Sequence, residues 1–344
     1  MFNLKNLLRK NIIELEPYSS ARSEYKNRAE VFLDANENPY GILNRYPDPL
    51  QQKLKQKLSD INGVSTQNIF IGNGSDEVID LAIRIFCVPG KDRVLSFSPT
   101  YGMYKVAAAI NDVEMLEVPL NSVFQIEQNS LSQTLQDPLL KIVFICSPNN
   151  PTGNCLNGIE FLLDQFKGII VLDEAYIDFA EEHTLISRLD KYPQLIISQT
   201  LSKAWGLAAA RIGIGYASSA IIDLFNKVKP PYNVSTPNQE AALKALSDVE
   251  TYKSNLTAIL EERLRVKIAL QNIKMLTKVY SSDANFLLVE TVDATAIYES
   301  LLHRGIVLRN RNQVVRNCIR ISIGTREEND KLIDAMLQIQ SSLL

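Results

Sequence analysis

The stretch "NIFIGNGSDEVIDLAIRIFCVPGKDRVLSFSP" (residues 68–99) contains a short β-rich run, a helical run and a second β-rich run. The first run ends at Gly74, and the helical run begins at Ser75. A strand, a helix and a second strand in this order are typical of a parallel sheet, whose strands need a crossover between them. The stretch therefore predicts the start of an α/β domain.

The same alternation continues along the chain from about residue 66 to residue 236. The β-rich runs lie at 68–74, 93–99, 113–120, 141–148, 168–176, 195–200 and 212–218. Several of these runs are apolar throughout, as strands covered on both faces must be. We therefore expect an α/β fold with a large domain in which helices flank a mostly parallel sheet.

After Pro237 the pattern changes. A long helical segment, 238–273, is followed by a β-rich run, a helix, a second β-rich run and a closing helix from Arg326. Thr325 and Glu328 have the spacing of a capping box at the start of that last helix. We expect a smaller α+β domain here, and we divide the chain into an N-terminal arm (1–30), a large domain (31–237) and a small C-terminal domain (238–344).

Composition excludes several classes of partner. Among 344 residues, 46% are hydrophobic and 22% charged, and the net charge of −3 argues against nucleic acid or an anionic membrane as the main partner. The longest apolar runs, such as 142–146, are too short to span a bilayer, and the N-terminus lacks the features of a signal peptide. The four cysteines form no C-x-x-C pair and the two histidines are isolated. We expect a cytoplasmic protein without a metal site.

Polar clusters follow the β-rich runs, at the strand ends where ligands bind in open α/β sheets. The first, "GNGSDE" (72–77), would offer the backbone N–H groups of Ser75 and Asp76 to a phosphate at a helix start. The third glycine of G-x-G-x-x-G is absent, which argues against a dinucleotide. A plain turn with a helix cap would explain the same residues.

The next two clusters follow neighbouring runs. "SPNNPTG" (147–153) holds Asn150 between two prolines, although a simple β-turn would account for it. "VLDEAY" (171–176) places Asp173 and Tyr176 at the end of an apolar strand. It resembles a Walker B box, but no phosphate-binding G-x-x-x-x-G-K-[ST] loop precedes it. A buried aspartate needs a different cation as its partner.

The fourth cluster, "TLSKAWGLAAAR" (200–211), carries Thr200, Ser202, Lys203 and Arg211. By itself Lys203 could be an ordinary lysine whose amine reaches solvent from an apolar loop. One cofactor uses an anion-binding helix start, a rigid asparagine, a buried aspartate, a tyrosine and a lysine together. That cofactor is pyridoxal 5′-phosphate (PLP), which lysine binds covalently while an acid pairs with the pyridine nitrogen.

With these residues in order, the chain closely resembles the fold-type I PLP-dependent aminotransferases of class II and, within them, the histidinol-phosphate aminotransferases. The resemblance covers nearly the whole chain, and its motifs are "PYSSAR" (17–22), "LDANENPYG" (33–41), "NRYPDP" (44–49), "PTYGMY" (99–104), "SPNNPTG", "DEAYIDF" (173–179), "TLSKAWGLA" (200–208), "LRN" (308–310) and "CIRISIGTREEN" (318–329). It implies transamination between L-histidinol phosphate and 2-oxoglutarate in histidine biosynthesis. It also implies a homodimer with shared active sites.

The resemblance further implies a role for each matching residue. Lys203 would bind the cofactor and move the substrate proton, with Asp173 at the ring nitrogen. Asn150 and Tyr176 would hydrogen-bond to the ring hydroxyl, and Tyr101 would stack on the ring. The implied phosphate ligands are Ser75, Asp76, Thr200, Ser202, Arg211 and, from the neighbouring subunit, Tyr46. The implied substrate ligands are Arg320, Arg309, Tyr18 and Asn36.

Two questions stay open at this level. The family usually has a glycine within an "LAGLR"-like stretch before the arginine, whereas this chain reads "LAAAR" (207–211), which would stiffen the loop if the local φ is negative. The alternatives to histidinol-phosphate transamination are a decarboxylase of a phosphorylated amino acid such as threonine phosphate, and an aromatic amino acid aminotransferase. A non-catalytic PLP-binding module fused to a DNA-binding domain would need more residues than the chain has.

Overall fold

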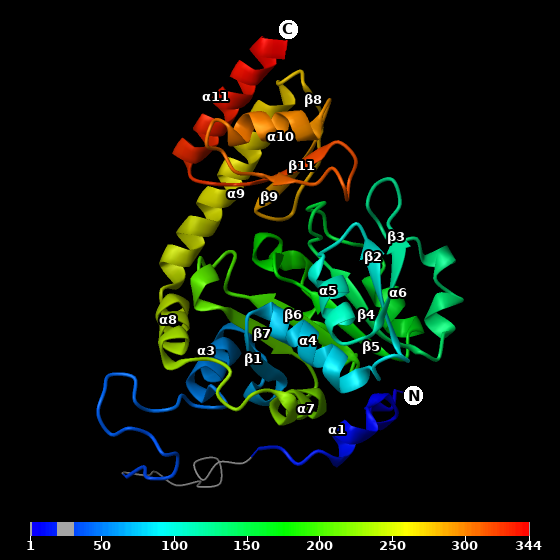
Figure 1. Cartoon of the computed structure of the whole chain (residues 1–344), viewed down its shortest axis with the longest axis vertical. Coiled ribbons are helices and arrows are strands. Elements are labelled where there is room, and N and C mark those ends of the chain that lie inside the picture. The colour runs from blue at the N-terminus through cyan, green and yellow to red at the C-terminus, as the bar shows by residue number, and fades with distance from the viewer. Residues whose placement is uncertain (1, 19–30, 344) are drawn as a thin grey trace.

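The computed structural model describes residues 2–18 and 31–343. Its lower lobe is built on a seven-stranded sheet with the order β1-β7-β6-β5-β4-β2-β3 (Figure 1). The strand β7 runs antiparallel to its neighbours β1 and β6, whereas β2–β3, β2–β4, β4–β5 and β5–β6 are parallel pairs. The prediction of a mostly parallel sheet is confirmed. The strands are β1 (Ile69–Asn73), β2 (Arg93–Ser98), β3 (Glu114–Pro119), β4 (Leu140–Cys146), β5 (Ile169–Asp173), β6 (Leu195–Thr200) and β7 (Ile212–Tyr216).

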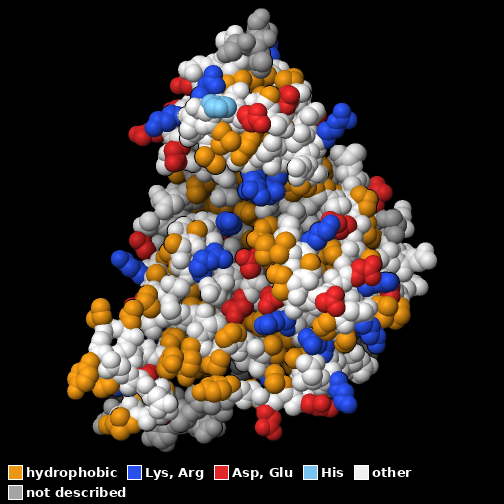
Figure 2. Space-filling view, viewed as in Figure 1, with side chains coloured by type: hydrophobic (Ala, Val, Ile, Leu, Met, Phe, Trp, Pro, Cys, Tyr) orange, Lys and Arg blue, Asp and Glu red, His pale blue; other side chains and the backbone are white. Residues whose placement is uncertain are grey.

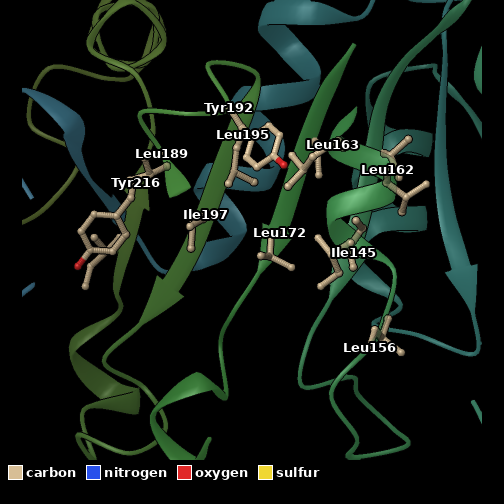
Figure 3. Close-up of a cluster of buried hydrophobic side chains, with 14 of the residues drawn as sticks. Ile145, Leu156, Leu162, Leu163, Leu172, Leu189, Tyr192, Leu195, Ile197 and Tyr216 are labelled. Carbon is tan, nitrogen blue, oxygen red and sulfur yellow. The ribbon is translucent and has the colours of Figure 1, made fainter. Parts of the chain in front are cut away.

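Alternate residues of each central strand enter two different hydrophobic clusters. Leu172 and Ile197 belong to the cluster on one face (Figure 3), and Val171 and Ile196 belong to the cluster on the other. These four side chains are almost wholly inaccessible to solvent. Because successive side chains of a strand point to opposite faces, burial on both faces requires the apolar runs seen in the sequence.

Helices cover both faces of this sheet (Figure 1). Side chains of α1, α4, α5 and α7 pack into one cluster, and side chains of α3, α6 and α8 pack into the other. The helices are α1 (Lys10–Glu14), α3 (Gln52–Asn62), α4 (Ser75–Phe86), α5 (Met103–Ile110), α6 (Ile159–Gln165), α7 (Ser219–Val228) and α8 (Thr236–Ser247). The sheet is thus the middle layer of three, and its strand ends open toward the upper lobe.

The upper lobe contains an antiparallel sheet with the order β10-β11-β9-β8, packed against α9, α10 and α11 around its own core. This is the smaller α+β unit that the sequence predicts. Its elements are α9 (Val249–Gln271), β8 (Leu276–Val279), β9 (Phe286–Thr291), α10 (Ala294–Leu302), β10 (Arg309–Asn310), β11 (Cys318–Ser322) and α11 (Arg326–Leu343).

The helical segment predicted at 238–273 is two helices, α8 and α9. They are separated at Asp248, which has φ −107° and ψ 65° and whose side chain accepts a hydrogen bond from the backbone N–H of Thr251. Ala242 of α8 packs with the large sheet, whereas Val266 of α9 packs with the small one. The helix α9 therefore connects the two lobes (Figure 1). The domain boundaries remain predictions, and residues 19–30 of the predicted arm lie outside the described residues.

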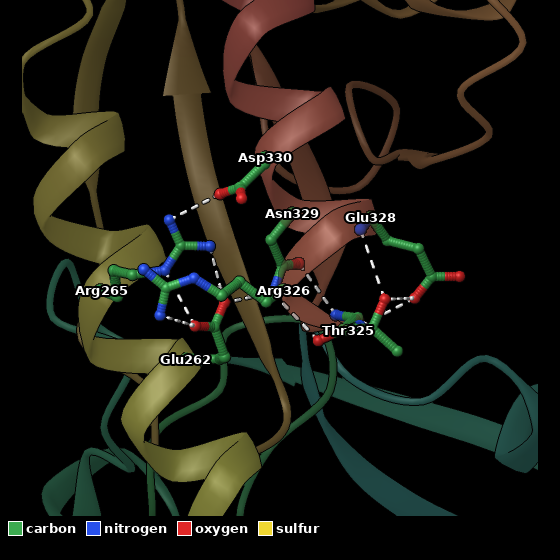
Figure 4. Close-up of polar contacts among 8 residues, drawn as sticks. Glu262, Arg265, Thr325, Arg326, Glu328, Asn329 and Asp330 are labelled. Atoms are coloured by element: carbon green, nitrogen blue, oxygen red, sulfur yellow. Dashed lines mark hydrogen bonds and ion pairs between the residues drawn. The ribbon is translucent and has the colours of Figure 1, made fainter.

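Polar contacts hold α11 to α9 (Figure 4). The predicted capping box is present, because Thr325 Oγ1 accepts from the backbone N–H of Glu328 at 3.3 Å and Glu328 Oε2 accepts from that of Thr325 at 2.8 Å. On α9, Arg265 pairs with Glu262 at 2.8 Å and with Asp330 of α11 at 2.7 Å. Of these contacts, the ion pair between Arg265 and Asp330 joins the two helices of the upper lobe.

Candidate active site

A cavity lies at the carboxyl ends of β4, β5 and β6 and beside the start of α4. It is lined by Ser75, Asp76, Tyr101, Cys146, Asn150, Asp173, Ala175, Tyr176, Thr200, Ser202, Lys203 and Arg211. Every cofactor-binding residue expected from the sequence is in this group except Tyr46. Residues distant in sequence meet here because neighbouring parallel strands end at the same edge of the sheet.

The carboxylate of Asp173 lies on the floor of the cavity and is 2% exposed. Its Oδ2 accepts a hydrogen bond from the hydroxyl of Tyr104 at 2.7 Å, and its Oδ1 accepts from the backbone N–H of Ala175 at 3.1 Å. Burial raises the pKa of Asp173 to about 6, and these two hydrogen bonds and Lys203 oppose that rise. The carboxylate is poised to pair with a cation that enters the cavity.

Tyr104 contacts the site through Asp173, although the sequence indicated no role for it. It is fully buried, stacks on Phe144 with ring centroids 5.0 Å apart, and meets Tyr101 edge to face at 5.6 Å. It therefore connects the carboxylate of Asp173 with an aromatic ring that lines the cavity. In the sequence Tyr104 is the last residue of the motif "PTYGMY", but the resemblance implied a role for Tyr101 of that motif alone.

Lys203 is the amine of the site. Its Nζ lies 5.6 Å from the centroid of the Tyr176 ring, and it forms no hydrogen bond or ion pair with any described residue. Burial, and secondly the charge of Arg320, lower the pKa of Lys203. A lowered pKa favours the neutral amine, which is the nucleophilic and proton-accepting form.

Asn150 connects the large lobe with the small one. Its Nδ2 donates to the hydroxyl of Tyr176 at 3.3 Å, and its Oδ1 accepts from Nη1 of Arg320 at 2.6 Å. Arg320 comes from β11 of the upper lobe, and its guanidinium lies 5.1 Å from the centroid of the Phe286 ring. The predicted substrate residue Arg320 thus contacts the cavity through the predicted cofactor residue Asn150.

The start of α4 forms the side of the cavity that is suited to an anion. Gly74 has φ +81°, and a Cβ at that position would lie 2.5 Å from Nη2 of Arg211. A Cβ on Gly213 would lie 2.1 Å from the backbone of Gly74, so only glycine permits this approach. The N–H groups of Ser75 and Asp76 have no intrahelical partner at a helix start. Nearby, Arg211 Nη2 lies 3.8 Å from Asp76 Oδ2.

The "LAAAR" loop forms a short 3₁₀ helix at Ala208–Ala210. The φ angles of such a turn are negative, so alanine adopts them without strain. The positive φ angles of this loop fall at Gly206 (+68°) and Arg211 (+53°). The replacement of glycine in this loop is therefore compatible with its backbone.

The predicted cofactor residue Tyr46 and the remaining predicted substrate residues lie apart from the cavity within one chain. Tyr46 and Asn36 line a second pocket, where Tyr46 stacks on Tyr232 with ring centroids 4.4 Å apart. Tyr18 is 72% exposed. Arg309 is exposed on β10 and is the cross-strand neighbour of Arg320. The structure of the single chain brings Arg320 to the cavity but leaves Tyr18, Asn36 and Tyr46 outside it.

No group of three or more His, Cys, Asp or Glu side chains within the described residues is arranged to hold a metal ion. No helix among them has the length and apolar character needed to cross a bilayer.

Comparisons with known proteins agree with this geometry. Residues 21–336 match the family described as aminotransferase class I and II. A histidinol-phosphate aminotransferase of Parabacteroides distasonis is 50% identical over 98% of this chain and 99% of its own. The crystal structure of histidinol-phosphate aminotransferase from Sinorhizobium meliloti, in complex with pyridoxal-5′-phosphate, superposes with a TM-score of 0.80 at 27% identity, over 87% of this chain and 84% of the other.

The fold is also shared with an L-threonine-O-3-phosphate decarboxylase from Porphyromonas gingivalis. That structure superposes with a TM-score of 0.74 at 21% identity, over 87% of this chain and 91% of the other. The fold and the lysine-centred cavity define an aminotransferase-type enzyme. The chain belongs to aminotransferase class I and II and, within it, to the family of histidinol-phosphate aminotransferases.

Proposed function

We propose that this enzyme binds PLP and transfers the amino group of L-histidinol phosphate to 2-oxoglutarate, which gives imidazole acetol phosphate and glutamate in histidine biosynthesis. The observation that carries the proposal is that Lys203, which has no hydrogen bond or ion pair among the described residues, lies in one cavity with the buried carboxylate of Asp173. The family membership, and the neighbouring Arg309 and Arg320 on the small sheet, support histidinol phosphate as the substrate.

The residues present fit PLP. A buried aspartate with its pKa raised to about 6 suits a cationic ring N–H as its partner, because that pairing offsets the cost of burying the charge. The glycine-lined start of α4 and Arg211 suit a phosphate, with Thr200 and Ser202 as further donors. Asn150 and Tyr176, joined by a hydrogen bond, face the same cavity and suit a ring hydroxyl. Tyr101 provides a ring face.

When bound, PLP supplies an electron sink for the electron pair left at the substrate carbon that bears the amine. Lys203 Nζ would hold the cofactor, and its neutral amine would then take and return the proton at that carbon. Asp173 would keep the ring nitrogen protonated, and Tyr104 would keep the carboxylate in place by its hydrogen bond. Arg320 would bind the substrate anion, since it already approaches the cavity through Asn150.

The proposed enzyme is a homodimer with shared active sites. The described segment 31–46 carries large apolar side chains on the surface, among them Leu33, Tyr40 and Ile42, which are 91%, 83% and 100% exposed. Figure 2 shows hydrophobic side chains over this projecting part of the lower lobe. Exposed apolar patches of this kind mark interaction surfaces. Tyr46 and Asn36 lie in the same segment, so both would enter the active site of the partner subunit together.

A defined assay separates this function from its alternatives. Purified protein with PLP, L-histidinol phosphate and 2-oxoglutarate should form glutamate and imidazole acetol phosphate, detected by mass spectrometry. Lys203→Ala should abolish the reaction, and Lys253→Ala, which removes an exposed lysine of α9, should not. Release of CO₂ from threonine phosphate, without transamination, would instead identify a decarboxylase. Faster turnover of phenylalanine or tyrosine than of histidinol phosphate would identify an aromatic aminotransferase.

A further inference from the structure

Three arginines lie together at the edge of the small sheet that faces the large lobe. Arg309 of β10 is the direct cross-strand neighbour of Arg320 of β11. The backbone N–H of Arg311 donates to the carbonyl of Cys318 at 2.9 Å, so the ladder continues one step past β10. Side chains two residues apart on a strand point to the same face. Arg309 and Arg311 therefore share a face, with Cα atoms about 7 Å apart.

These charges lack acidic partners. None of the three arginines forms an ion pair with a described carboxylate. Arg320 donates one hydrogen bond to the neutral amide of Asn150. The Nε atoms of Arg311 and Arg320 are both buried without a hydrogen-bond partner among the described residues. Like charges directly opposite each other destabilise a sheet, and a buried unsatisfied donor costs stability as well.

The electrostatics of the group agree with its geometry. Burial and then the charges of Arg320 and Arg309 lower the pKa of Arg311, while Tyr176 acts in the opposite direction. Burial also lowers the pKa of Arg320, and Arg309 adds to that effect. Arg311 is thus close enough to interact electrostatically with both other arginines and with Tyr176, which lines the cavity. Figure 2 shows Lys and Arg side chains along the boundary between the lobes.

We propose that Arg311 is a third member of the substrate-anion site and that, with Arg309, it selects a phosphate monoester over a carboxylate. The inference rests on the proposed function and extends it to a residue that the sequence did not indicate. A phosphate monoester carries nearly two charges and three acceptor oxygens at neutral pH. A carboxylate carries one charge and is satisfied by the bidentate fork of Arg320. After Arg320 has paired with one charge of the phosphate, the second charge remains for Arg309 and Arg311 to bind.

The test uses Arg311→Gln, which removes the charge at similar length, and Arg311→Lys, which keeps the charge without the planar fork. Arg316→Gln is the matched control, because Arg316 is an exposed arginine of the same β10–β11 connection. Inorganic phosphate and butyrate, a monocarboxylate with one charge, are titrated by calorimetry into holoenzyme treated with borohydride, which blocks turnover while the cofactor still fills its own phosphate site. The probe then reports on the substrate site alone.

We expect Arg311→Gln to weaken phosphate binding by about tenfold or more, the scale of one lost charge contact, and butyrate binding much less. Arg311→Lys should be intermediate, and Arg316→Gln should match the unmodified chain. Single-turnover measurements should show the same asymmetry between histidinol phosphate and glutamate. Equal weakening of both probes in Arg311→Gln, or behaviour equal to that of Arg316→Gln, would overturn the proposal. If the unmodified enzyme does not accept histidinol phosphate, the proposed function fails, while the phosphate titration still decides the role of Arg311.

Discussion

The hydroxyl of Tyr104 donates a hydrogen bond of 2.7 Å to Oδ2 of Asp173. This contact joins a wholly buried tyrosine of α5 to the buried carboxylate at the floor of the cavity. The hydrogen bond favours the ionised carboxylate and so lowers the pKa that burial raises. It therefore controls the pH range over which Asp173 can pair with a cationic ring nitrogen.

Tyr104→Phe should shift the pH dependence of cofactor binding upward. In the apoprotein the pKa of Asp173 is about 6, so PLP affinity should fall as the pH drops below that value, and loss of the hydrogen bond should move the midpoint higher. Fluorescence titration of apoprotein with PLP at several pH values measures the pH midpoint of the PLP affinity. Tyr216→Phe is the control, since Tyr216 is equally buried but its hydroxyl accepts from Asn62. The same midpoint in both variants would show that Tyr104 only fills space.

Asp173→Asn should still bind the cofactor, with lower affinity because the ion pair to the ring nitrogen is lost, and should lose most of the activity, because an unprotonated ring nitrogen makes a poor electron sink. It should also stabilise the apoprotein at high pH. The folded pKa of Asp173 is raised from 3.8 to about 6, so its burial costs nothing below pH 3.8 and reaches its full cost above pH 6. Thermal melts should show a gain of up to about 3 kcal/mol at pH 8 and none near pH 4. Near-full activity of Asp173→Asn would show that Asp173 has only a structural role.

Lys203→Ala should prevent covalent attachment of the cofactor. Treatment of the unmodified holoenzyme with borohydride should leave PLP bound after denaturation, as mass spectrometry of the intact chain would detect. The variant should show neither that added mass nor transamination, because no other described lysine lines the cavity. Normal turnover in Lys203→Ala would refute the assignment of the catalytic lysine.

Mixed dimers should reveal whether Tyr46 serves a neighbouring subunit. Tyr46→Ala and Lys203→Ala should each be inactive, and a mixed dimer contains one site that keeps both residues. With free subunit exchange, the mixture should recover about a quarter of full activity, because about half of the dimers are mixed and each has one complete site. Absence of recovery, with exchange demonstrated by mass spectrometry, would place Tyr46 in the site of its own chain.

The two predicted substrate arginines should differ in their effects. Arg320→Ala should impair both half-reactions by about 2 to 5 kcal/mol, the scale of a desolvated charge losing its partner, and it also removes the hydrogen bond to Asn150. Arg309→Ala should slow the histidinol-phosphate half-reaction more than the glutamate half-reaction, since the phosphate group carries a second charge where the α-carboxylate of glutamate carries one. Rapid-mixing measurements of each half-reaction test this. Equal losses in Arg309→Ala would exclude it as a phosphate-selecting residue.

The sequence by itself determined the layered architecture, because burial on both faces demands apolar strands such as 169–172, and local chemistry such as that of Thr325 and Glu328 marks a helix start. It also indicated the lining of the cavity, since residues that follow parallel strands meet at one edge of the sheet.

Only the tertiary structure decided which ordinary-looking side chains join that site. Tyr104 lies in a helical stretch whose pattern is that of a core helix, and its bond to Asp173 depends on how α5 packs over β5, 69 residues away in sequence. Arg311 gains its neighbours from the antiparallel register that sets Arg309 opposite Arg320. Strand pairing and helix packing of this kind depend on side chains that are far apart in the chain. A sequence pattern reports chiefly on residues that are close together in the chain.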